Sequence, residues 1–312
     1  MKTKLHTIIV PVYNSRETLV LLVDRVSRVM NDAQIHFELV LVDDGSEDGS
    51  FEEIRRLSRL HSFIRGFRLS RNFGHQAALV IGLEKSRGDF IAIIDDDLQD
   101  PSDILPDFFQ RLYEDVDVVY GVRRKRKENF IKKFSYYFFY RSLRILSKVN
   151  IPLDAGDFCV MKRCVVDAIL QFHEVNPFLR GIRSWVGFKQ IGVEYQRNAR
   201  VKGKSGYTFK KYFSLAGAAI LSFSYIPLRL ATILGTLAAF FGFIFAAWVV
   251  CLWLIEPFDV PGYTSLIVII TFLGGVQLIT IGILGEYIAR LSDNIRKRSV
   301  AVVAETTCEE SS

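Results

Sequence analysis

The stretch FIAIIDDDLQDP, residues 90–101, places three adjacent aspartates directly after a run of apolar residues. A short apolar run bounded by polar residues is typical of a buried β-strand. Each of Asp95, Asp96 and Asp97 raises the cost of ionising the next, so a cation or hydrogen-bond donors must compensate them. Asp95 and Asp97 can both reach a hard divalent cation whose other ligands are phosphate oxygens. Read alone, however, the stretch also fits a polar turn.

The residues around this stretch alternate between short apolar runs and longer amphipathic segments. We expect strands at 7–13, 37–46, 64–70 and 90–96, and helices at 15–32, 51–60 and 74–86, with Ser15 capping the first helix. Such alternation indicates an α/β domain with a mainly parallel sheet covered on both faces. Ligands gather at the carboxyl ends of such strands, which here carry PVYN, DDGS and DDDLQD. Asp43 and Asp44 are placed there to accept hydrogen bonds from a base or ribose.

The carboxy-terminal third contains two long uncharged segments. Residues 230–255 and 263–285 carry no charged side chain, and each exceeds the roughly 20 residues that a helix needs to cross a bilayer. We therefore expect two transmembrane helices within 229–290, at about 230–255 and 263–287, followed by a tail at 291–312. Lysine and arginine flank the outer ends of the pair but are absent from its connector. The positive-inside rule then places both termini and the α/β domain in the cytoplasm.

The basic residues outside these spans concentrate near aromatic ones. Residues 121–134 are rich in lysine and arginine and lead into an aromatic segment, where we expect an interfacial helix at about 130–149; an ordinary core-facing helix with a solvated basic side is the alternative. A juxtamembrane loop and amphipathic helix are expected at 205–228. We interpret the net charge of +6 as attraction to anionic lipid and not to nucleic acid. The scattered cysteines and histidines leave only oxygen ligands for a metal.

Several ordered motifs resemble a known family. The segments IIVPVYNSRETL, LVLVDDGSEDGS, the acidic stretch, LDAGDFCVMKR and KGKSGYTFKKYFSLA resemble the inverting glycosyltransferase family 2 with its GT-A fold. The closer likeness is to its polyprenyl-phosphate branch, which includes bactoprenol glucosyltransferases, the undecaprenyl-phosphate aminoarabinose transferase and, more distantly, dolichyl-phosphate mannose synthase. The resemblance implies a Rossmann-like GT-A domain over 1–204, in a multi-pass protein of the bacterial inner membrane. It also implies a homo-oligomer, in some relatives a tetramer.

The resemblance implies roles for individual residues. The nucleotide sugar would be bound by Pro11, Tyr13, Asn14, Glu17, Asp43, Asp44, Asp95, Asp96, Arg200 and Lys202. A Mg²⁺ or Mn²⁺ ion would be held by Asp95, Asp97 and Gln99, with Asp96 in the variable middle position and pointing away from the metal. The acceptor phosphate would meet Arg123, Arg124, Arg126, Lys133, Lys204, Ser205 and Tyr207.

The catalytic residues implied are Asp157, Asp97 and Arg123. Asp157 matches the carboxylate often assigned as catalytic base. A phosphate monoester has a second pKa of about 6, so its oxygen needs little proton removal, and Asp157 with Asp154 could instead orient a cation, an arginine or a sugar hydroxyl. Arg123 could bind phosphate bidentately.

The reaction expected is a transfer of EC class 2.4. An inverting single displacement would move a sugar, best expected from UDP-glucose, onto polyprenyl phosphate at the cytoplasmic leaflet, for later modification of a cell-envelope glycan. Two other classes stay open at this stage: a processive polysaccharide synthase of the same superfamily, and a non-catalytic regulatory domain on a membrane tether. Product analysis separates the first from the transferase, and any transfer by purified protein excludes the second.

Overall fold

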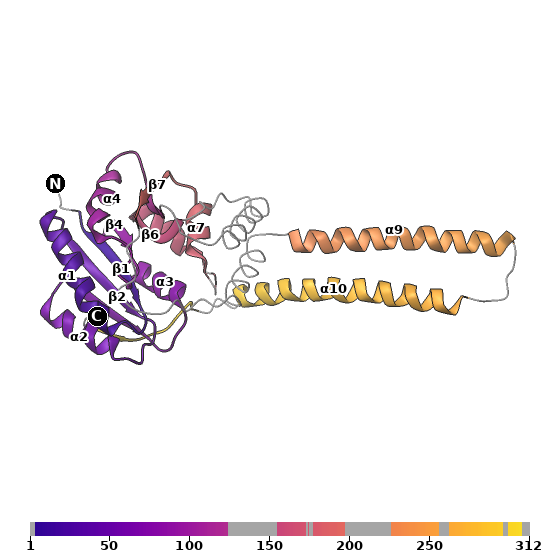
Figure 1. Cartoon of the computed structure of the whole chain (residues 1–312), viewed down its shortest axis with the longest axis horizontal. Helices are drawn as coiled ribbons and strands as arrows, with labels where there is room; N and C mark the ends of the chain where they lie inside the picture. The colour runs from indigo at the N-terminus through magenta and orange to yellow at the C-terminus, as the bar shows by residue number, and fades with distance from the viewer. Residues whose placement is uncertain are drawn as a thin grey trace. The chain divides into compact units, whose positions relative to one another are not determined.

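The computed structural model describes residues 4–123, 155–172, 174, 177–196, 226–255, 262–295 and 299–307. These residues form two units, which are described separately (Figure 1). The first is an α/β unit that includes residues 299–307 from the end of the chain. The second is a pair of long helices, α9 (Ile226–Ile255) and α10 (Tyr263–Ile295).

The α/β unit is built on an eight-stranded sheet in the order β7-β5-β6-β4-β1-β2-β3-β8. The strands are β1 (His6–Val12), β2 (Phe37–Asp43), β3 (Ile64–Leu69), β4 (Phe90–Ile93), β5 (Val118–Arg123), β6 (Ala155–Lys162), β7 (Gln190–Tyr195) and β8 (Val303–Thr306). The four neighbours β4, β1, β2 and β3 are parallel, as expected. The sheet as a whole is mixed, because β6 runs antiparallel to β4 and β5, and β8 antiparallel to β3.

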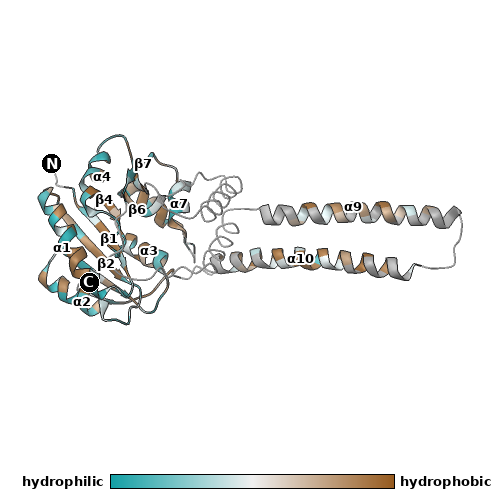
Figure 2. Ribbon diagram, in the orientation of Figure 1, coloured by the Kyte–Doolittle hydropathy of each residue, from teal (hydrophilic) through white to brown (hydrophobic). Residues whose placement is uncertain are grey.

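Helices cover both faces of the sheet, and each face has its own apolar core. One core gathers side chains of α1 (Arg16–Asp32), α2 (Ser50–Leu60) and α4 (Leu105–Arg111), which follows the short helix η1 (Ser102–Ile104). The other gathers α3 (His75–Lys85), α6 (Arg163–Leu170) and α7 (Leu179–Trp185). Figure 2 shows hydrophobic residues along the strands and hydrophilic ones on the outward faces of α1 and α2. The expected strands and helices of the first hundred residues are confirmed.

The expected cap of the first helix is wrong in its chemistry. Ser15 occupies the N-cap position of α1, but its hydroxyl donates to the carbonyl of Tyr13 at 3.1 Å and makes no cap bond. Its backbone (φ −125°, ψ 26°) lies outside the extended region that capping serines adopt. The Arg16 N–H instead donates to Asp48 Oδ2 at 3.1 Å.

The two long helices coincide with the uncharged segments. α9 spans the expected 230–255, and α10 spans 263–287 and continues to Ile295. Among the described residues, one stretch, Phe272–Ala289 in α10, is long and apolar enough to cross a membrane, and α9 offers a shorter apolar run. The two helices contact each other. The interfacial helix expected at 130–149 and residues 205–225 lie outside the described residues.

The end of the chain differs from the expected tail. Residues 303–306 form β8, which pairs with β3 and becomes the edge strand of the sheet. The strand VAET has only four residues, too few for an alternating pattern to be recognised in the sequence.

Candidate active site

The candidate site lies at the carboxyl ends of β1, β2 and β4, which meet along one rim of the sheet. β6 is antiparallel to β4, with Cys159 paired with Ile93, so the first residues of β6 reach the same rim. The sheet order therefore lines up Asp157 of β6, the acids after β4, Tyr13 after β1 and Asp43 at the end of β2. This places three separated acidic groups along one rim.

The loops after β1 and β2 are joined through Asn14. Its N–H donates to Ser46 Oγ at 2.9 Å, and its side-chain oxygen accepts the Glu47 N–H at 3.1 Å. Asn14 has a positive φ of 51°, a conformation that asparagine tolerates better than most residues. Beside it the residue Tyr13 is 49% exposed, which leaves an aromatic side chain open at the rim.

Asp43 is fully buried at the end of β2. Its carboxylate accepts the Ser46 N–H at 3.3 Å, and Oδ2 lies 3.5 Å from the Nε of Arg68. Burial raises the pKa of Asp43, against the lowering effect of Ser46 and then Arg68. This carboxylate is thus incompletely compensated within the protein, and a hydrogen-bond donor from a ligand would stabilise its charge.

Asp44 supports the loop that leads into α3. Its Oδ1 accepts the Phe73 N–H at 2.7 Å, and its Oδ2 accepts the Gly74 N–H at 3.0 Å. At Gly45 (φ +69°) a Cβ would lie 2.6 Å from the backbone carbon of Arg71, so the two loops meet too closely for a side chain. Asp44 therefore fixes the start of α3, although the resemblance implies contact with the nucleotide.

The three acids after β4 have different surroundings. Asp95 Oδ1 lies 3.8 Å from His75 Nε2, whereas Asp96 Oδ2 accepts the Tyr13 N–H at 3.2 Å. Asp97 Oδ1 accepts the Gln99 N–H at 3.1 Å in a local turn. Asp96 thus faces the loop after β1, while Asp95 faces α3 and β6. The three acids look equivalent in the sequence, but each contacts a different part of the structure.

These acids suit a divalent cation by the chemistry of their oxygens. Burial first, and then the charge of Asp100, raises the pKa of Asp95 to about 7, and a bound cation would favour its ionised form. Among the described residues, however, no three His, Cys, Asp or Glu side chains converge on one point as a ready ion site.

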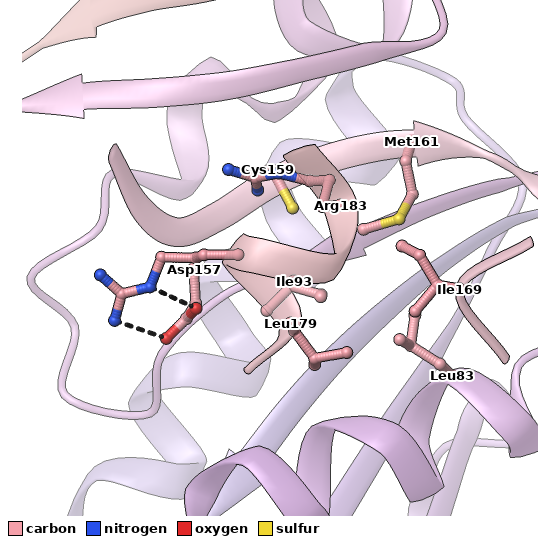
Figure 3. Close-up of a pocket in the computed structure, with 9 residues that line it drawn as sticks. Leu83, Ile93, Asp157, Cys159, Met161, Ile169, Leu179 and Arg183 are labelled. Atoms are coloured by element: carbon pink, nitrogen blue, oxygen red, sulfur yellow. Dashed lines mark hydrogen bonds and ion pairs between the residues drawn. The ribbon is translucent and has the colours of Figure 1, made fainter. Parts of the chain in front are cut away.

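Asp157 is held by two cationic side chains. Its Oδ1 accepts the Arg180 Nε–H at 2.9 Å and its Oδ2 lies 3.4 Å from the second guanidinium nitrogen (Figure 3). His75 Nε2 lies 3.3 Å from Oδ2, and Gln76 donates to the same oxygen at 3.3 Å. Burial alone would raise the pKa of Asp157, but Arg180 and His75 outweigh it and hold that pKa well below its usual range.

His75 is the counterpart of this carboxylate. Burial opposes its protonation, but the hydrogen bond and charge of Asp157, with Asp95 and Asp96 behind them, raise the pKa of His75 to about 9. The imidazole is therefore a cation at neutral pH. Arg180, Arg183 and Asp157 also line a small pocket whose other walls are apolar (Figure 3).

The remaining predicted residues divide into those that the structure describes and those that it does not. Pro11 is buried in β1, Glu17 is exposed in the first turn of α1, and Gln99 is half-buried. The backbone of Arg123 ends β5 and pairs with Tyr195. Outside the described residues lie Arg124, Arg126, Lys133, Asp154, Arg200, Lys202, Lys204, Ser205 and Tyr207.

Sequence reasoning missed His75, Arg180 and Arg68. His75 is the first residue of α3, directly after Gly74 in the loop that follows β3, and this place at the carboxyl end of a strand is a usable signal of a site residue. Arg180 and Arg68 lie in ordinary amphipathic segments, and nothing local marks them. A further missed contact joins Tyr195 Oη to Asp100 Oδ1 at 2.7 Å, between two buried side chains.

Known proteins resemble this chain in sequence over half or more of its length. The model of the family "Glycosyl transferase family 2" matches residues 7–170. The uncharacterized glycosyltransferase YkcC of Bacillus subtilis is 39% identical over 96% of this chain and 94% of that protein. The bactoprenol glucosyl transferase of Shigella phage SfII is 36% identical over 96% of this chain and 97% of that protein.

A weaker likeness links the chain to solved structures. The mannosyltransferase PcManGT from Pyrobaculum calidifontis in complex with GDP-Man and Mn²⁺ is 17% identical, with a TM-score of 0.46 over 93% of this chain and 86% of that chain. The mixed α/β sheet itself fits the GT-A fold that the motifs imply. From the family model, which matches more than half of the chain, and the two near full-length relatives, we conclude that the chain belongs to glycosyl transferase family 2 and is a transferase.

Proposed function

We propose that the protein transfers a single sugar from a nucleoside diphosphate to polyprenyl phosphate, with inversion at the anomeric carbon. The observation that supports this most is the order of acidic groups along the rim: Asp43, then Asp95 to Asp97, then Asp157. A donor laid along that rim would place its base at one end, its diphosphate in the middle and the transferred sugar at the other. The named relatives that cover almost this whole chain include a bactoprenol glucosyl transferase.

The base and ribose are assigned to the end at β2. The buried Asp43 carboxylate would accept hydrogen bonds from the base, and the exposed ring of Tyr13 offers a stacking surface. Asn14 would keep the two loops at a fixed distance. Pro11 and Glu17, which flank the loop after β1 in the sequence, would line the nucleotide pocket. Arg200 and Lys202 are proposed to neutralise the diphosphate from the segment that follows β7.

The diphosphate is assigned to the centre. Asp95, Asp97 and Gln99 would hold Mg²⁺ or Mn²⁺, which when bound would supply positive charge to the leaving diphosphate. Asp96 would stay with the loop after β1, where its contact to the Tyr13 N–H keeps that loop beside the acids.

At the third position we assign Asp157 to positioning the site. Its low pKa makes it a weak proton acceptor, because Arg180 and His75 already compensate its charge. A phosphate acceptor with a second pKa of about 6 is ionised at neutral pH and needs no strong base. Asp157 would therefore orient Arg180 and His75 beside the reacting sugar, and Arg123 with the basic residues after it would bind the acceptor phosphate.

The lipid acceptor gives the two long helices a role. We propose that α9 and α10 form a transmembrane hairpin, with both termini and the α/β unit in the cytoplasm and the acceptor drawn from the inner leaflet. UDP-glucose is the proposed donor, after the bactoprenol glucosyl transferase relatives.

Incubating the purified full chain with undecaprenyl phosphate, Mg²⁺ or Mn²⁺ and a panel of nucleotide sugars tests this proposal. Mass spectrometry of the lipid should find the mass of one hexose added with UDP-glucose. Growth of the product into a polymer would identify a processive synthase instead. No modification of the lipid by any donor, in a preparation that still binds nucleotide, would overturn the acceptor assignment.

A further inference from the structure

The edge of the sheet nearest Asp43 is completed by the end of the chain. β8 pairs with β3 so that Glu305 stands opposite Arg68 and Thr306 opposite Phe67. Upstream of the strand, the Ser70 N–H donates to the Val302 carbonyl at 2.9 Å, and Ala301 is buried in the core formed with α3, α6 and α7. The segment 299–307 is thus an integral part of the α/β unit.

Gly66 allows this segment to come close. The Thr307 N–H donates to the Gly66 carbonyl at 2.9 Å, and the Gly66 N–H donates to Thr307 Oγ1 at 2.8 Å. A Cβ at Gly66 would lie 2.8 Å from Thr307 Cγ2 and 2.3 Å from Ile54 Cγ2. The lack of a side chain at Gly66 therefore lets Thr307 pack directly against β3.

Arg68 connects this edge to the proposed nucleotide end of the site. One terminal nitrogen of its guanidinium donates to Glu305 Oε1 at 3.1 Å, and the other donates to the Ser46 carbonyl at 3.3 Å. Its Nε lies 3.5 Å from Asp43 Oδ2. Because the guanidinium is planar and rigid, fixing one of its edges orients the others.

Glu305 is itself held in place from a second side. Its Oε2 accepts a hydrogen bond from Arg55 at 2.5 Å, while Oε1 accepts from Arg68. Arg55 and Arg68 both lie over the ring of Phe51. Glu305 thus bridges α2, which follows the loop that carries Asp44 and Ser46, and β3, which pairs with β2 beside Asp43.

We propose that Glu305 is a positioning residue for nucleotide binding: from the carboxy-terminal strand it holds Arg68 against Asp43 and Ser46. This inference rests on the proposed function, in which Asp43 meets the base. A strand that only covers the sheet edge would affect stability and leave nucleotide affinity unchanged. Glu305 is 43% exposed in its ion pairs, so the loss of its charge should disturb folding little.

The test measures the Kd of UDP for the full chain in detergent with Mn²⁺, by calorimetry, together with the Tm and the donor KM and kcat. Glu305→Gln should weaken UDP binding and raise the donor KM roughly three- to tenfold, the size of one hydrogen bond, with kcat and Tm nearly unchanged. The matched control is Asp107→Asn, which breaks an exposed arginine–carboxylate pair on α4 at 3.0 Å and should leave all four quantities unchanged.

A double mutant locates the effect. If Glu305 acts through Arg68, then Glu305→Gln should weaken UDP binding no further in an Arg68→Gln background. Additive losses, or an unchanged Kd in Glu305→Gln, would overturn the inference. The Asp43→Asn variant distinguishes failure of this inference from failure of the proposed function. If Asp43→Asn binds UDP as tightly as the wild type, the nucleotide assignment fails. If Asp43→Asn weakens UDP binding and Glu305→Gln does not, only the role of Glu305 is removed.

Discussion

Asp43 and Asp157 are both buried carboxylates beside an arginine, and they differ in how completely the protein compensates them. Arg180 meets Asp157 through two nitrogens, at 2.9 and 3.4 Å, and His75 adds a third contact. Arg68 meets Asp43 through one nitrogen at 3.5 Å. The pKa of Asp157 is accordingly lowered, and the pKa of Asp43 is raised by burial.

The two carboxylates therefore differ in how much a further hydrogen-bond donor could stabilise their charge. A carboxylate with two strong partners gains little from a further donor, whereas an undercompensated one gains a full charge-assisted hydrogen bond. Burial alone does not distinguish the two, and neither does the presence of an arginine. The number and length of the contacts do.

The largest effect on activity is expected at Asp97, which follows β4 and so lies between Asp43 and Asp157 along the rim. Asp97→Ala should abolish sugar transfer, with a loss of about 100-fold or more, because the leaving diphosphate loses a proposed metal ligand. The membrane insertion and the Tm of this variant should stay close to wild type, since Asp97 is only half-buried. Transfer assays at saturating Mn²⁺ measure this, and normal turnover there would remove the metal assignment.

Asp157→Asn should cost stability as well as activity. The change leaves Arg180 and the protonated His75 without their counter-charge, and breaking a buried pair typically costs about 3–5 kcal/mol. We expect the low end, because Arg180 is 29% exposed, and a clear fall in Tm by scanning fluorimetry. The double variant Asp157→Asn/Arg180→Gln should recover part of the Tm that Asp157→Asn loses. A variant with wild-type Tm but no activity would instead favour a proton-transfer role for Asp157.

Asp43→Asn should change stability less than Asp157→Asn does, and with the opposite sign. Because the folded-state pKa of Asp43 is raised, the folded protein holds this proton more tightly than the unfolded chain, and stability is lost as the pH rises above about 4. Asparagine removes that loss, so the Tm at pH 7 should equal or exceed that of the wild type, while UDP binding weakens. If the Tm of Asp43→Asn exceeded that of the wild type at pH 4 but not at pH 7, the raised pKa of Asp43 would be contradicted.

The sequence predicts the parts of the site that depend on local pattern. Strand ends are visible because apolar runs stop there, and parallel strands bring Asp43 and Asp95 to one rim for topological reasons. The partners of Asp157 were not predictable in this way. Arg180 lies 23 residues away and Gln76 lies 81 residues away, and no periodicity relates them. Ser15 shows the same limit at short range, since a suitable residue at an N-cap does not guarantee the cap bond.

The position of β8 also has a consequence for biosynthesis. A ribosome adds β8 only after α9 and α10, and the Gly66–Thr307 contact spans 241 residues. Until then β3 is an open edge, and open edges invite pairing with other chains. A nascent chain stopped before residue 303 keeps that edge exposed, whereas a chain that includes β8 covers it. Closure of this edge of the sheet is therefore a late event in synthesis, which follows the translation of both long helices.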